Sequence, residues 1–135
     1  MTISLKFVNI TVLNVDESIA FYQQLGLEVK MDVANGGFRW VTLGSDAQPG
    51  LGITLSEPGA GRSEESANAL QELLVKGELP MLVFAVDDLD ATFENLRAHG
   101  AEVLQEPMDQ GWGPRDCAFR DPSGNMVRIA QAPAA

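Results

Sequence analysis

The stretch Asn14–Val29, NVDESIAFYQQLGLEV, decides the fold because a related stretch, Asp88–Val103, DLDATFENLRAHGAEV, follows it 74 residues later. Each copy begins with a capping side chain, continues with apolar residues at helical spacing, and ends with a glycine before a β-rich segment. A fixed internal period means that one supersecondary unit is present twice. Two copies indicate a paired module, since solenoids need three or more repeats. The sequence therefore predicts two similar half-sheets, with a ligand-sized groove between them.

The first unit is predicted to be a β-α-β-β-β module over residues 1–56. Asn14 is a good helix N-cap, and Gly26 can supply the left-handed conformation that ends the helix. The turn 35–37, Asn-Gly-Gly, favours a hairpin because these residues tolerate positive φ. Alternation in the first strand places Phe7 and Asn9 on one face. The predicted strands span 3–13, 27–34, 38–43 and 51–55.

The second unit, over residues 80–135, repeats this pattern, with a helix capped by Asp88. The predicted strands span 81–86, 102–106, 115–119 and 126–131. A connector, 57–79, separates the units, and Ser63 is expected to cap a short helix within it. This connector is expected either to cover part of a groove or partner subunit, or to be a surface linker with one packed helix.

Composition narrows the function classes. The 135 residues carry a formal net charge of −10, which argues against nucleic acid and against an anionic membrane surface. A half of about 65 residues buries too little surface to be robust alone, so the halves should share a core or dimerise. One cysteine, Cys117, excludes an intramolecular disulfide. Without a secretory-signal pattern or a membrane-length apolar run, a cytoplasmic protein is expected.

Several motifs together resemble the vicinal oxygen chelate superfamily, which includes glyoxalase I, extradiol dioxygenases, fosfomycin-resistance enzymes and bleomycin-resistance proteins. The matching motifs are VLNVDES at 12–18, Phe21-Tyr22, LGL at 25–27, VDDLD at 86–90, GAEV at 100–103 and FRDPSGN at 119–125. The resemblance covers essentially the whole chain. It implies an α+β glyoxalase-like fold, in which two tandem β-α-β-β-β modules form a cupped mixed sheet, often completed in a dimer. It does not fix the reaction, because this scaffold hosts many activities.

The resemblance also implies where a metal would lie, on the first and last strands of each module. The corresponding residues are Phe7, Thr54, Met81 and Arg128, and each pair is 74 residues apart. A divalent site needs His, Asp, Glu or Cys donors, whereas these positions offer a ring, a hydroxyl, a thioether and a permanent cation. A two-residue slip on the first strands would bring Asn9 and Val83 into place, which also gives no strong site. We therefore expect no metal and no cofactor.

The groove is instead predicted to bind a small molecule on an apolar surface with a few polar points. Trp112, in a glycine-rich loop, is expected at the rim, where it can stack on flat or cationic ligands. Arg115 and Arg128 could bind a carboxylate, carbonyl or phosphate. Two alternatives remain open: Trp40 is plain core, and Arg128 pairs with Asp116. The predicted ligand-binding residues are Phe7, Asn9, Phe38, Trp40, Thr54, Met81, Trp112, Arg115 and Arg128.

Two other reactive side chains have structural explanations. His99 ends a helix, where a cation favours the helix dipole, and the pattern places it outside the groove. Cys117 either lines the groove beside Arg115 or is an inert buried thiol.

Three functions follow, and no catalytic residue is predicted. The first is a metal-free, homodimeric binding protein of bleomycin-resistance type that sequesters an aromatic or cationic compound. The second is a metal-independent lyase or isomerase in which Arg128, Arg115 and Asn9 stabilise an enolate. The third, opposed by the substituted ligand positions, is a divalent-metal glyoxalase or dioxygenase.

Overall fold

The structure is a computed structural model that describes residues 1–134, and it contains two β-α-β-β-β units. The first unit consists of β1 (Phe7–Thr11), α1 (Val15–Leu25), β2 (Glu28–Asn35), β3 (Phe38–Gly44) and β4 (Gly52–Ser56). The second consists of β5 (Leu82–Val86), α3 (Leu89–Ala98), β6 (Glu102–Asp109), β7 (Arg115–Arg120) and β8 (Met126–Gln131), and α2 (Glu64–Lys76) lies between the units. Ala135, the last residue of the predicted second module, lies outside the described residues.

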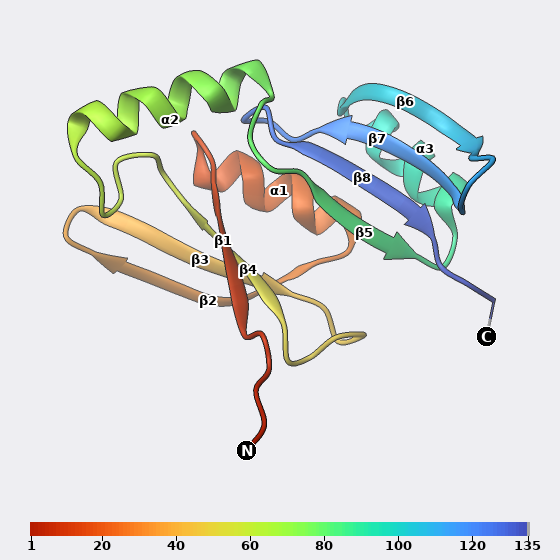
Figure 1. The fold of residues 1–135 in the computed structure, drawn as a ribbon, viewed down its shortest axis with the longest axis horizontal. Helices are drawn as coiled ribbons and strands as arrows, with labels where there is room; N and C mark the ends of the chain where they lie inside the picture. The colour runs from red at the N-terminus through yellow and green to blue at the C-terminus, as the bar shows by residue number, and fades with distance from the viewer. Residues whose placement is uncertain (135) are drawn as a thin grey trace.

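Each unit builds its own mixed sheet, with strand orders β1-β4-β3-β2 and β5-β8-β7-β6. The pairs β1–β4 and β5–β8 are parallel, and the remaining neighbours are antiparallel. The predicted α+β fold of two tandem modules is therefore confirmed. In Figure 1 the first sheet lies on the left and the second on the right, and α2 runs along the top.

The two modules share one hydrophobic core. Helix α1 contacts β3 and β4, α3 contacts β7 and β8, and the two helices contact each other. Apolar residues recur on one face of each helix, so both sheets bury their helix-facing sides against this central pair. Buried side chains from both halves therefore form a single cluster that includes Val12, Tyr22, Val41, Leu55, Leu89, Phe93, Leu96, Phe119 and Ile129.

The helix ends follow the predicted caps, whereas two strand ends differ. Asn14 Oδ1 accepts from Glu17 N at 3.0 Å, and Asp88 Oδ1 accepts from Ala91 N at 3.1 Å. The first strand was predicted over 3–13 but spans 7–11, because β1 is an edge strand and its neighbour β4 begins only at Gly52, opposite Phe7. Strand β6 continues to residue 109, three residues past its predicted end, because β7 pairs with it along this length.

The 74-residue period shifts by two at one strand pair. Thr42 pairs with Thr54 in the first sheet, whereas Ala118 pairs with Arg128 in the second. The loop before β7 is longer than the tight turn before β3, which accounts for the shift. The structural counterpart of Trp40 is consequently Asp116, so a carboxylate in the second module occupies the place of an indole in the first.

The DPSGN motif fastens the second module to the first. Asp121 is buried, and its Oδ1 accepts from the backbone N–H groups of residues 123–125 at 2.9–3.0 Å. Its Oδ2 accepts from the Tyr22 hydroxyl of α1 at 2.7 Å, and Asn125 donates to the Thr11 carbonyl at 2.9 Å. Burial, followed by the charge of Asp121 and its hydrogen bond, raises the pKa of Tyr22 well above its ordinary value, so the phenol stays protonated.

The connector combines a packed loop with an exposed helix. An added Cβ at Gly59 would lie 3.1 Å from the Phe38 ring, so the loop after β4 lies against this aromatic side chain. In α2, Leu74 is buried, while Leu73 remains 41% exposed. The predicted surface linker with one packed helix thus fits α2, and the predicted groove cover fits the loop. Within residues 1–134, no helix combines the length and apolarity needed to cross a membrane.

Candidate functional site

Strand alternation gathers the first-module candidates on one face of the first sheet. Val41, Leu43 and Leu55 are buried toward α1, so the residues between them point to the other side. On this side the Thr42 and Thr54 hydroxyls lie 2.8 Å apart in a hydrogen bond. We call this surface the first-module face, and it consists of Phe7, Asn9, Met31, Val33, Phe38, Trp40, Thr42 and Thr54. Trp40 is half-buried on this face and is not core.

The second sheet presents a more polar surface in the same way. Cys117, Phe119, Val127 and Ile129 are buried toward α3, which turns Arg128 to the opposite side. We call this surface the second-module face, and it consists of Met81, Val83, Gln105, Asp116, Ala118 and Arg128. Asp116 is only 3% exposed, whereas Met81 and Val83 are 53% and 60% exposed.

A buried carboxylate orients Arg128. Asp116 Oδ2 accepts from Arg128 Nη1 at 2.9 Å, and its Oδ1 accepts from Gln105 and Gln110 at 3.0 and 2.8 Å. Arg128 Nη1 also donates to Gln105 Oε1 at 3.2 Å. The predicted alternative that Arg128 pairs with Asp116 is confirmed. Within residues 1–134 no acceptor meets Arg128 Nε or Nη2, and its side chain is 26% exposed, so part of the fork remains available to an acceptor on a ligand.

The same network predicts an acid dependence of stability. Burial raises the pKa of Asp116, but the hydrogen bonds from Gln110, Arg128 and Gln105 outweigh it and hold the pKa below the ordinary 3.8. A carboxyl whose folded pKa is depressed stabilises the fold above its unfolded pKa and loses that contribution as pH falls through the folded value. Urea unfolding should therefore show an Asp116 contribution that is constant from pH 5 upward and declines below about pH 4. Asp116→Asn should remove this acid-dependent part, and an unchanged slope would contradict the assignment.

Two predicted residues lie apart from these faces. Arg115 points to the helix side, where it donates to Asp90 of α3 at 3.0 Å and lies 3.7 Å from Asp109. Trp112 is 80% exposed, in the turn that Gly113 N closes on the Gln110 carbonyl. The structure thus brings Phe7, Asn9, Phe38, Trp40 and Thr54 onto one face and Met81 and Arg128 onto another, and Trp112 projects from the loop beside Asp116.

The sequence of the whole chain matches one family model. The Glyoxalase/Bleomycin resistance protein/Dioxygenase superfamily model matches residues 4–129. The chain belongs to this superfamily.

Individual relatives agree with this membership. The uncharacterized protein YurT of Bacillus subtilis (strain 168) is 33% identical over 118 residues, covering 86% of this chain and 89% of YurT. The crystal structure of UcmS2 is 34% identical, with a TM-score of 0.85, over 96% of this chain and 98% of UcmS2. TnmS3, described as an antibiotic binding protein from Streptomyces sp. CB03234, shares the fold at 22% identity and a TM-score of 0.75, over 98% of this chain and 99% of TnmS3.

The metal site of the superfamily does not fit the residues present in this member. The positions that the resemblance assigns to ligands hold the Phe7 ring, the Met81 thioether, the Thr54 hydroxyl and the Arg128 guanidinium. Thr54 is engaged by Thr42, and Arg128 repels a cation. Across the described residues, His, Cys, Asp and Glu side chains form no group of three suited to a metal ion. This donor set has no chelating chemistry for a divalent ion.

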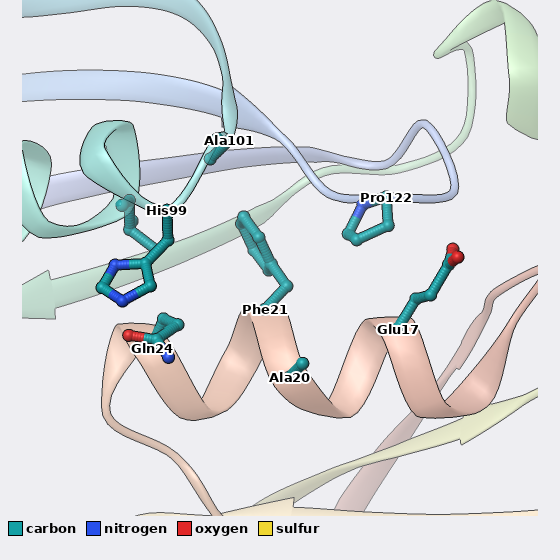
Figure 2. A pocket seen from close by; sticks show the side chains of 9 residues that line it. Glu17, Ala20, Phe21, Gln24, His99, Ala101 and Pro122 are labelled. Carbon is teal, nitrogen blue, oxygen red and sulfur yellow. The ribbon is translucent and has the colours of Figure 1, made fainter.

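A separate hollow of about 250 Å³ lies where α1 meets the second module. Figure 2 shows the Phe21 ring rising from α1 toward Pro122, with Glu17 and Gln24 on either side and His99 near Gln24. Its volume is below the usual range for ligand pockets, and no predicted site residue lines it. His99 Nδ1 lies 2.7 Å from the Asn95 carbonyl at the end of α3, consistent with the predicted structural role. We interpret this hollow as the seam between the modules.

Cys117 is an inert core thiol in this superfamily member. It is fully buried on the helix side of β7, away from the second-module face. Burial, with the charge of Asp116, raises the pKa of the thiol to about 11. Ellman's reagent at pH 8 should not react with the folded protein and should react fully in denaturing urea. Rapid reaction without urea would contradict this placement.

Gln105 and Gln110 were missed from the sequence. Neither residue type is distinctive, and both reach Asp116 only because of strand pairing and the longer loop before β7. Met31, Val33 and Thr42 were also missed, although period-two alternation around Trp40 would have placed them on the same face.

Proposed function

We propose that this protein binds a small, flat aromatic molecule bearing an acceptor group and does not transform it. The observation that carries this proposal is the pairing of an aromatic face with a partly free arginine fork. Phe7, Phe38 and Trp40 supply stacking surface on the first-module face, and Arg128 supplies directed donors on the second. The description of TnmS3 as an antibiotic binding protein supports the same class of activity on this fold.

We further propose that each binding cup forms between two copies of the chain. Because α1 and α3 lie on the inner sides of both sheets and contact each other, the two faces turn away from one another within one chain. The edge strands β1 and β5 carry exposed apolar side chains, with Phe7 44% and Val83 60% exposed. Open edges and apolar patches of this kind are normally covered. A homodimer would bring the first-module face of one copy onto the second-module face of the other.

The chemistry around Arg128 favours binding over catalysis by a metal-independent lyase. Such an enzyme needs a base near the oxyanion stabiliser, with a pKa near the working pH. Asp116 contacts Arg128, but its oxygens are occupied by three donors and its pKa is lowered, which makes it a weak base. Arg115, the other arginine of that alternative, is engaged by Asp90 on the far side of the sheet.

Fluorescence titration with two aromatic dyes of opposite charge tests the proposal. Anilinonaphthalene sulfonate carries an acceptor for Arg128, whereas proflavine is a cation attracted by the net charge of −10. The proposal predicts saturable sulfonate binding that Trp40→Ala weakens and Arg97→Ala leaves unchanged, because Arg97 is an exposed residue of α3 paired with Glu94. Saturable binding of proflavine alone would favour a cationic ligand, and binding of neither dye would contradict an aromatic site.

A further inference from the structure

We propose that Gln110 is a positioning residue that latches the Trp112 turn to the arginine of the binding face. This inference rests on the proposed function for its consequence, the closing of an indole over the ligand bound at Arg128. Its structural basis is a continuous chain of hydrogen bonds from the turn to the guanidinium.

Gln110 holds the turn in two ways. Its carbonyl accepts from Gly113 N at 3.3 Å, which closes the turn around Gly111 and Trp112. Its side chain reaches back to the sheet and donates to Asp116 Oδ1 at 2.8 Å. The backbone of the turn and its anchor on the sheet therefore depend on one residue, which stands two positions from the indole.

The anchor is rigid because Asp116 is fixed from three directions. It is 3% exposed, and Gln105 on β6 and Arg128 on β8 bind it from neighbouring strands. A charge-assisted hydrogen bond to a buried carboxylate is stronger than a neutral one at the surface. The same carboxylate thus sets both the direction of the arginine fork and the position of the turn.

Trp112 has little else to hold it. Its side chain is 80% exposed, and glycines flank it on both sides. Large exposed indoles are typical of surfaces that close on a ligand or partner. With Gln110 latched, the indole is presented beside Asp116 and Arg128; without the latch, the glycines leave the turn free to sample other positions.

Fluorine NMR of protein labelled with fluorotryptophan tests the latch without a ligand. The chain has two tryptophans, so Trp112→Phe assigns both resonances. Gln110→Met keeps the length of the side chain but removes the donor, and Gln110→Glu faces Asp116 with a second carboxylate. Gln71→Ala, at an exposed position of α2, is the matched control. We expect both Gln110 variants to shift or narrow the Trp112 resonance toward that of a mobile indole and to leave the Trp40 resonance in place.

Titration with anilinonaphthalene sulfonate then separates the latch from the function. We expect Gln110→Met to weaken binding of the dye by about 3- to 10-fold, chiefly through faster dissociation. An unchanged Trp112 resonance in both variants would overturn the latch, whether or not the dye binds. A shifted resonance with no dye binding to the wild type would support the latch and count against the proposed function. Unchanged dye affinity in a variant with a shifted resonance would overturn the coupling of the turn to the site.

Discussion

Asp121→Ala is expected to lower the free energy of unfolding by about 3–5 kcal/mol, since it removes a buried charge and strands its donors. The Tyr22 hydroxyl and the N–H groups of residues 123–125 would lose their acceptor inside the protein. The loss falls on the seam between the modules, because Tyr22 belongs to α1 and the turn belongs to the second sheet. Urea unfolding followed by circular dichroism measures the change.

Two further variants bracket this result. Tyr22→Phe removes one of the bonds to Asp121 and is expected to cost about 1–2 kcal/mol. Asp46→Ala removes an exposed carboxylate paired with Lys30 and should change stability by less than about 0.5 kcal/mol. If Asp121→Ala unfolds as easily as Asp46→Ala, the turn is not the fastening that we describe.

Arg128→Gln is expected to weaken binding of anilinonaphthalene sulfonate by about 10- to 100-fold. Charge-assisted hydrogen bonds contribute about 1.5–3 kcal/mol, and 1.4 kcal/mol corresponds to a factor of ten in affinity. Glutamine retains a donor for Asp116, so the buried carboxylate keeps a partner and the fold is preserved. Isothermal calorimetry on the variant gives the affinity, and Arg115→Gln is the matched control because Arg115 lies on the helix side. Equal losses in both variants would remove Arg128 from its special place in the site.

Local patterns carried most of the fold. The caps at Asn14 and Asp88 and the internal period were sufficient for the two modules, because each signal acts within one turn or one strand. Helix-facing alternation also placed Phe7 and Asn9 correctly on one face. The ends of β1 and β6 depended on where a neighbouring strand begins, which is a property of the assembled sheet.

The site was less accessible to sequence reasoning for a related reason. Arg115 was grouped with Arg128, although strand alternation separates them onto opposite sides of the sheet. The two-residue shift at β7 brings Asp116 to the position that corresponds to Trp40, and no feature of the sequence fixes the length of that hairpin. Contacts made across strands, such as Gln105 and Gln110 with Asp116, follow only after this register is known.

Complementation between two binding-deficient variants tests the central claim most directly. Trp40→Ala damages only the first-module face and Arg128→Gln only the second, so each homodimer has two damaged cups. Refolding an equimolar mixture from urea gives heterodimers in about half of the dimers, each with one cup built from two intact faces. Calorimetric titration with anilinonaphthalene sulfonate should therefore recover about one quarter of the wild-type sites at wild-type affinity. A mixture that binds no better than the separate variants would show that the site is not shared between copies in the way proposed here.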